Sequence, residues 1–186
     1  MRTIIECGTK EFWDWFILNN EKYLNIDNCN SKQREDLLNE LLQELHKYCS
    51  HLFFEFSVDS SSRQGELIIT ADGNSDYFEK ANLLVKEAPL FESWKIISLI
   101  PNRGIPYTLE FEGRTLNPKK IWFLPLLNTK IPEAIGVRIG IEEYDPDDKW
   151  LLPAINKMID NIVGEKFAAE IIKQIQVYSM ESGFGI

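Results

Sequence analysis

The stretch HLFFEFSVDSSSRQGELIITADG, residues 51–73, decides the fold class because its hydrophobic residues stop following a helical period. Phe54, Phe56 and Val58 share one face of its first half, as in a strand. A polar turn over 59–65 leads to a second strand-like segment at 66–71. The stretch therefore predicts a β-hairpin.

Amphipathic helices are predicted on both sides of this hairpin. Two precede it, at 9–24 and 31–49, with Thr9 and Ser31 as the expected caps. Leucines recur with the helical period along the second of them, opposite a polar face. A third helix is predicted at 76–87, where Pro89 stops it.

The second half of the chain is predicted to be rich in strands. One long helix is expected at 149–163, and a short helical piece at 166–171 precedes a last strand at 174–178. The tail, 179–186, is expected to be loose. Four further strands are expected at 94–100, 107–111, 121–127 and 135–141.

Together these elements predict an α+β fold in a single domain, 1–186. Its helical N-terminal part would cover 1–50, and a sheet with two helices would cover 51–178. Because short links containing Gly and Pro join the strands, we expect a mostly antiparallel sheet of about six or seven strands. The helices are expected to pack on one face of that sheet.

The charge balance argues against nucleic acid and against an anionic membrane surface as partners. The chain has 29 acidic and 20 basic residues, a formal net charge of -9, and its bases are scattered. Phosphate binding requires clustered Lys and Arg, and Lys119-Lys120 is the only adjacent basic pair. Three cysteines, no signal peptide and no long apolar run predict a cytoplasmic protein.

No motif for catalysis or for cofactor binding is present. The sequence lacks both glycine-rich phosphate motifs and the G-x-S-x-G elbow of hydrolases. His46, Cys49 and His51 have zinc-ligand chemistry, but a structural site requires four ligands. Acids from Asp72 onward resemble the start of a calcium loop, yet the required later Gly and Glu are missing. We therefore expect no cofactor, no metal and no catalytic residue.

Arginines and aromatic residues in the strand-rich half are the best candidates for a binding surface. Gly136 and Gly140 flank Arg138 on one strand face, which leaves room for backbone, an aromatic ring or a ligand to approach closely. Trp122 and Leu124 alternate out of phase with the residues expected in the core. The candidate ligand-binding residues are Arg138, Arg103, Arg114 and Trp94, and the candidate partner-binding residues are Trp122 and Leu124.

Part of the chain resembles a bacterial family of uncharacterised proteins. The resemblance rests on Leu52–Phe56, on Glu66–Gly73 and on the run Leu84–Trp94, which reads LVKEAPLFESW. It continues weakly to Gly164-Glu165 and covers roughly residues 45–178. It implies a bacterial, cytosolic origin and brings no catalytic residue with it.

Two hypotheses for function follow from these observations. The first is a non-enzymatic module for protein interaction or regulation, which binds a protein partner through the strand-rich half. The alternative is a binding protein or enzyme for a small anionic ligand, with a pocket near Arg138, since arginine suits carboxylate and phosphate. A flat apolar patch around Trp122 would favour the first hypothesis, and a deep pocket containing Arg138 would favour the second.

Overall fold

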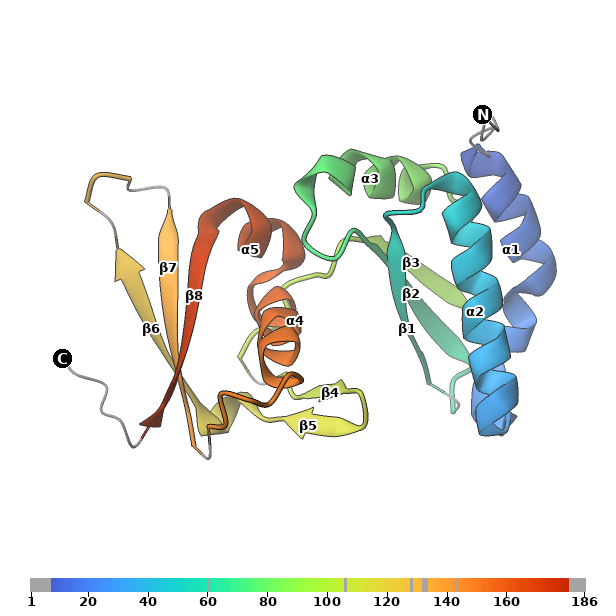
Figure 1. Cartoon of the computed structure of the whole chain (residues 1–186). Helices are drawn as coiled ribbons and strands as arrows, with labels where there is room; N and C mark the ends of the chain where they lie inside the picture. Colours follow the sequence, from blue (N-terminus) through green and yellow to red (C-terminus); the bar gives the residue numbers. More distant parts are fainter. Residues whose placement is uncertain are drawn as a thin grey trace, which may run out of the picture. The chain divides into compact units, whose positions relative to one another are not determined.

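The computed structural model describes residues 8–59, 61–105, 107–127, 129–131, 134–142 and 144–180 (Figure 1). Over these residues the chain has five α-helices and eight strands, which form sheets of three, two and three strands. The predicted α+β class is confirmed. The chain divides into two compact units, Met1–Leu99 and Ile100–Ile186. None of the helices in the described residues is long and apolar enough to cross a membrane.

The first unit combines three helices with one three-stranded sheet. In that sheet β2 lies between β1, which is antiparallel to it, and β3, which is parallel to it. The parallel pair requires a crossover, which α3 supplies. The predicted hairpin and the N-terminal helical pair are confirmed. The elements are α1 (Thr9–Leu24), α2 (Ser31–Tyr48), β1 (Phe53–Asp59), β2 (Gln64–Thr70), α3 (Phe78–Lys86) and β3 (Trp94–Ser98).

The helix caps lie one residue earlier than predicted. Ser31 is the first residue of α2, and Asn30 caps it in a reciprocal arrangement with Gln33. The Asn30 side chain accepts from the backbone N–H of Gln33, and the Gln33 side chain accepts from the N–H of Asn30, both at 3.0 Å. Thr9 likewise begins α1 and does not cap it. The exchange satisfies two N–H groups that the helix itself leaves without partners.

An aromatic cluster closes the helix-covered face of the first sheet (Figure 1). Phe16 of α1 is fully buried, and its ring centroid lies 5.5 Å from that of Trp94. Tyr23 of α1 is also fully buried and contacts Phe56 of β1. Gly65 lies directly beneath Trp94, because a Cβ built there would be 2.5 Å from its ring atoms. Aromatic side chains from α1 therefore cover this face of the sheet.

The second unit repeats the same strand order in another sheet. Here β7 lies between an antiparallel β6 and a parallel β8, and α4 and α5 form the crossover. A separate hairpin, β4–β5, turns tightly at Glu112-Gly113, where both residues have positive φ as hairpin turns require. The elements are β4 (Leu109–Phe111), β5 (Arg114–Leu116), β6 (Ile121–Leu127), β7 (Ile135–Ile141), α4 (Leu151–Val163), α5 (Glu165–Ile171) and β8 (Ile172–Ser179).

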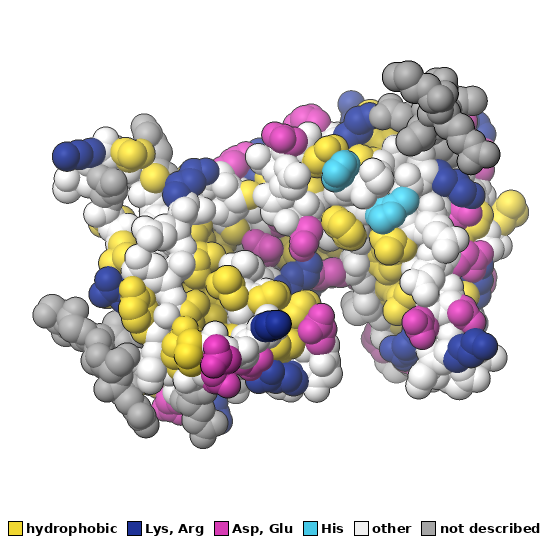
Figure 2. Space-filling model, in the orientation of Figure 1, with side chains coloured by type: hydrophobic (Ala, Val, Ile, Leu, Met, Phe, Trp, Pro, Cys, Tyr) yellow, Lys and Arg dark blue, Asp and Glu magenta, His cyan; other side chains and the backbone are white. Residues whose placement is uncertain are grey.

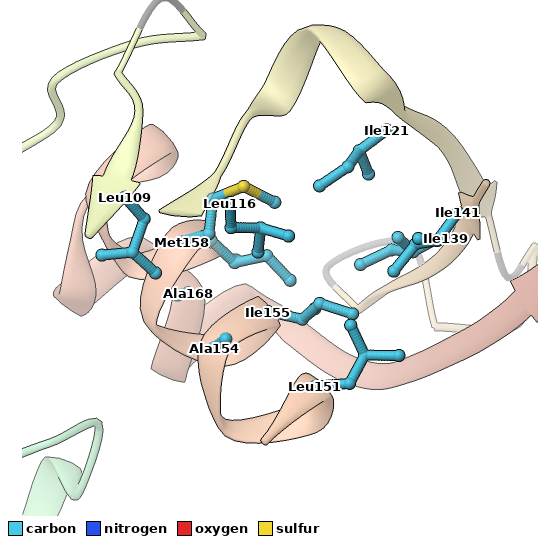
Figure 3. Close-up of a cluster of buried hydrophobic side chains, with 11 residues drawn as sticks. Leu109, Leu116, Ile121, Ile139, Ile141, Leu151, Ala154, Ile155, Met158 and Ala168 are labelled. Carbon is cyan, nitrogen blue, oxygen red and sulfur yellow. The ribbon is translucent and has the colours of Figure 1, made fainter. Parts of the chain in front are cut away.

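The core of the second unit forms where α4 packs on one face of its sheet (Figure 3). Ile155 and Met158 are fully buried in it, and Ile139 of β7 packs from the sheet side. The β4–β5 hairpin adds Leu109 and Leu116, which lie near Met158 (Figure 3). The first three turns of α4 thus have apolar partners on both the sheet and the hairpin.

Glu165 is a fully buried acid that anchors the start of this unit. Its Oε2 accepts from the backbone N–H of Ile100 at 2.9 Å, and its own N–H donates to the Ile100 carbonyl oxygen at 2.9 Å. Gly164 precedes it with a φ of 91°, a conformation that favours glycine. A buried carboxylate is tolerated when hydrogen bonds satisfy it, so Glu165 has a structural role.

The prediction of a single sheet of six or seven strands is wrong. Period-two patterning identifies strands, but it does not say which strands pair. The expected strand at 94–100 ends at Ser98 because Leu99 adopts a positive φ of 60°, which an extended strand cannot continue. The parallel pairs were also not expected. The prediction of one domain stays a prediction, and most of the tail, 181–186, lies outside the described residues.

Candidate binding face

The register of the β6–β7–β8 sheet brings the predicted ligand-binding and partner-binding residues together. Leu124 pairs with Arg138, and Trp122 pairs with Gly140, so all four lie on the face opposite α4. On the other side of β7, Gln176 pairs with Arg138 and Tyr178 pairs with Gly140. We call this surface the outer face; its residues are Trp122, Leu124, Leu126, Gly136, Arg138, Gly140, Gln174, Gln176 and Tyr178.

Arg138 lies at the centre of the outer face and has no acidic partner among the described residues. Its guanidinium carbon is 5.2 Å from the ring centroid of Tyr178, a distance typical of a cation–π contact. The Tyr178 hydroxyl donates to the side-chain oxygen of Gln176 at 3.2 Å. The Arg138 Nε is buried without a hydrogen-bond partner in the described part of the chain. An incoming acceptor would therefore find an unneutralised cation held in place by an aromatic ring.

Exposed apolar side chains surround this cation. Trp122 is 42% exposed, Leu124 37% and Tyr178 41%. The side chains are close neighbours, because adjacent strands lie about 4.8 Å apart. Figure 2 shows hydrophobic side chains reaching the surface of the second unit with Lys and Arg among them. An apolar surface interrupted by one arginine is the composition that protein interfaces favour.

The glycines beside Arg138 keep the outer face shallow. A Cβ at Gly136 would lie 3.3 Å from the Leu126 Cβ, so the missing side chain lets Leu126 lean over β7. Gly140 similarly separates Trp122 from Tyr178 across the sheet. Gly136 is half-buried, so a ligand or partner can approach the backbone there, whereas Gly140 is buried.

The other predicted ligand-binding residues do not share this surface. Arg114 makes a bidentate ion pair with Asp148, with its shorter N–O distance at 2.8 Å, and stacks 4.0 Å from the centroid of Trp150. Hydrogen bonding from Arg114 lowers the pKa of Asp148 below its usual value. Arg103 lies over the Tyr107 ring at 5.5 Å. Trp94 is buried in the core of the first unit.

The residues considered for metal binding have structural contacts instead. The described residues contain no group of three or more His, Cys, Asp or Glu side chains that could hold a metal ion. His46 Nε2 donates to the carbonyl oxygen of Leu52 at 3.1 Å, and His51 stacks on Tyr77 at 4.2 Å. Asp145 accepts from the backbone N–H of Asp147 at 2.9 Å, in the turn that precedes α4.

Three residues of the outer face, Gln174, Gln176 and Tyr178, were not predicted from the sequence. Their strand was expected at 174–178, and the alternation of Gln174, Gln176 and Tyr178 was a usable signal. What was missing was the parallel pairing of β8 with β7, which places Tyr178 beside Arg138. Comparisons of the chain with family models, with curated proteins and with solved structures found no match.

Proposed function

We propose that the protein is a non-enzymatic module that holds a protein partner on the outer face. The partner would place an aliphatic or aromatic side chain on Trp122 and Leu124, and an Asp or Glu carboxylate on Arg138. The observation that carries the proposal is Arg138, which has no acidic partner among the described residues and lies between exposed apolar residues on one sheet face. The cytoplasmic, bacterial setting implied by the sequence belongs to the same proposal.

The chemistry of Arg138 supports a carboxylate as the polar contact. A guanidinium offers a planar fork of donors that matches a carboxylate, and the Tyr178 ring restricts its motion. Its cross-strand neighbours are Leu124 and Gln176, neither of which carries a negative charge. A carboxylate from outside would therefore gain a charge-assisted hydrogen bond without displacing an internal ion pair.

The sequence of β6 favours docking of a partner on the outer face over pairing of a partner strand with the edge of β6. Strand β6 is an edge strand of the sheet, and Pro125 lies in its middle, paired in register with Val137. Proline has no N–H to donate, so it is tolerated where that position points away from β7. An added strand would meet Pro125 where it needs a donor, which disfavours edge pairing.

A pocket for a small anion is the weaker alternative. One cavity lined by described residues of this unit lies on the opposite side of the sheet, and its lining residues are all apolar. Arg138 is not among them, and no convergent acid lies beside it in the described residues. The exposed side chains of Trp122, Leu124 and Tyr178 support a protein partner over a small anion.

Affinity capture with matched variants tests the proposal. The full chain, Arg138→Gln and Trp122→Ala would each serve as bait in lysate of the source organism, with bound proteins and small molecules identified by mass spectrometry. Leu18→Ala and Arg34→Gln, exposed in the first unit, are the controls. We expect a partner that both outer-face variants lose and both controls retain, since such anchors contribute about 2 kcal/mol or more. A stoichiometric small molecule without any protein would overturn the proposal.

A further inference from the structure

The inner side of the same sheet contains a second feature, an apolar cavity of about 220 Å³. Its walls come from β6 and β7, from the last turns of α4 and from the start of β8. One residue of the loop before β4, Ile105, completes it. The lining residues are Ile105, Phe123, Pro125, Val137, Ile159, Ile162, Val163 and Ile172.

The cavity lies beside the last turns of α4, next to the filled core of this unit. In that core, Leu109 and Leu116 of the β4–β5 hairpin pack near Met158 (Figure 3). Neither hairpin residue lines the cavity, whose helix wall is formed by Ile159, Ile162 and Val163. The hairpin therefore leaves the space between these last turns and the sheet unfilled.

The chemistry of the lining selects the ligand. All eight side chains are apolar, so the cavity has no hydrogen-bond donor or acceptor side chain for a polar group. Apolar walls offer water no hydrogen-bond partners, and an enclosed engineered cavity of about 150 Å³ is known to take up benzene. On that scale, the space here suits a ring or a chain of roughly six to nine carbon atoms.

Two of the lining residues are exposed to solvent, and they mark where a ligand would enter the cavity. Ile105 is 63% exposed and Phe123 is 36% exposed, although both line the cavity. Ile159, on the helix, is 4% exposed and lies at the closed side. A ligand can therefore keep a polar end in water while its apolar end is buried.

We propose that the protein binds a small amphiphile by inserting its aliphatic or aromatic end into this cavity. The site is on the opposite side of the sheet from the outer face, so the two proposals stand independently. Because no charged side chain lines the cavity, the polar end contributes little to affinity. An alcohol and an acid of equal chain length should bind alike.

Titration of the full chain with n-alkanols of four to twelve carbons tests this inference. Calorimetry should show affinity rising about fourfold per methylene, which corresponds to about 0.8 kcal/mol per buried CH₂, and levelling off once the cavity is full. Nuclear Overhauser contacts from 1-hexanol to the methyl groups of Val137 and Ile159 would place the ligand without any substitution. Absence of binding, or binding without those contacts, would overturn the inference.

Two filling variants and one control complete the test. Val137→Phe and Ile162→Phe fill the cavity from opposite walls and should weaken alkanol binding at least tenfold. Leu124→Phe makes the corresponding change on the outer face and should leave alkanol affinity unchanged. Equal weakening by all three, or loss of alkanol binding in Leu124→Phe alone, would show that the ligand is not in the cavity. If one filling variant fails to fold, the other decides the result. Retained capture of a protein partner by Val137→Phe would separate this site from the outer face.

Discussion

The two three-stranded sheets share one plan and differ in how their faces are covered. Each has an antiparallel pair followed by a parallel strand reached through a helical crossover. In the first sheet, the rings of Phe16 and Trp94 cover the helix side, and Trp94 fills the space above Gly65. In the second, Gly136 and Gly140 flank Arg138 on a face with exposed Trp122.

Because of this difference, some aromatic residues stabilise the fold, whereas others are available for binding. The first unit buries Phe16 and Tyr23 fully in its core, although Phe53 of β1 is 41% exposed. The second unit builds its core from aliphatic residues of α4 and leaves Trp122 and Tyr178 at the surface. Exposed apolar residues that gather on one face often mark contact with another molecule, which supports the binding role proposed for the outer face.

The largest expected effect contrasts one aromatic residue from each unit. Phe16→Ala should lower the free energy of unfolding by about 3–5 kcal/mol, because it leaves a cavity in a closed aromatic cluster. Trp122→Ala should lower it by less than about 1 kcal/mol, because that ring is already 42% exposed. Urea denaturation followed by circular dichroism measures both.

The same pair of variants can show that the two units do not differ in how they use these aromatic residues. A loss of stability in Trp122→Ala equal to that in Phe16→Ala would mean that Trp122 belongs to a core. The outer face would then not be a binding surface, and loss of partner capture by Trp122→Ala would only report unfolding.

A smaller effect contrasts the glycines of the two sheets. In Gly65→Ala the new methyl group would lie 2.5 Å from the Trp94 ring, which neighbouring rings hold in place. We expect a loss of about 1–3 kcal/mol, as for other overpacked sites. In Gly136→Ala the nearest atom is the Leu126 Cβ at 3.3 Å, and Leu126 can shift toward solvent. That variant should stay within about 1 kcal/mol of the parent.

Thermal melting of the two alanine variants provides the measurement. Equal destabilisation would show that the second sheet is as tightly covered as the first. Partner capture by Gly136→Ala adds a functional control, because a methyl group there fills part of the space beside Arg138 without removing the charge.

The sequence predicted the secondary structure better than the way its strands pair. Alternation found β1, β2, β6 and β7 because each carries an apolar face of several residues. It missed β5, Arg114–Leu116, because three residues cannot show a period. The single sheet was wrong because alternation identifies strands without saying which of them pair, and the β1–β2–β3 and β6–β7–β8 strands pair in separate sheets.

The candidate site shows the same limit. Arg138, Trp122 and Leu124 were selected from the sequence for separate reasons, and only the register between β6 and β7 places them on one face. Arg114 was selected for its charge, and its ion pair with Asp148 depends on a contact 34 residues away in the chain. The apolar cavity could not be predicted from the sequence, because its lining residues have the composition of an ordinary core.

The smallest expected effect concerns acid, and it contrasts one carboxylate from each unit. In the β1–β2 turn, hydrogen bonds from the side chains and backbone of Ser61 and Ser62 lower the pKa of Asp59 to about 2. In the second unit, the hydrogen bond from Arg114 lowers the pKa of Asp148. A depressed pKa stabilises the folded state above the unfolded pKa, near 4, and this contribution is lost as the pH falls through the folded value. The contribution of Asp59 to the stability of the folded state should therefore be lost as the pH falls from about 4 to about 2.

Salt distinguishes the two carboxylates. The Asp59 shift comes from neutral hydroxyl and amide donors, whereas the Asp148 shift comes first from the hydrogen bond that the charged Arg114 donates. The backbone N–H of Trp150 and the charge of Arg114 contribute less. At 1 M salt, where the Debye length is about 3 Å, the pKa of Asp148 should rise slightly while that of Asp59 changes little. Titration of both carboxyl carbons by NMR measures this, with Ser61→Ala raising the pKa of Asp59 and Arg114→Ala raising that of Asp148. If the pKa of Asp148 does not change with salt, the hydrogen bonds from Arg114, and not its charge, lower that pKa.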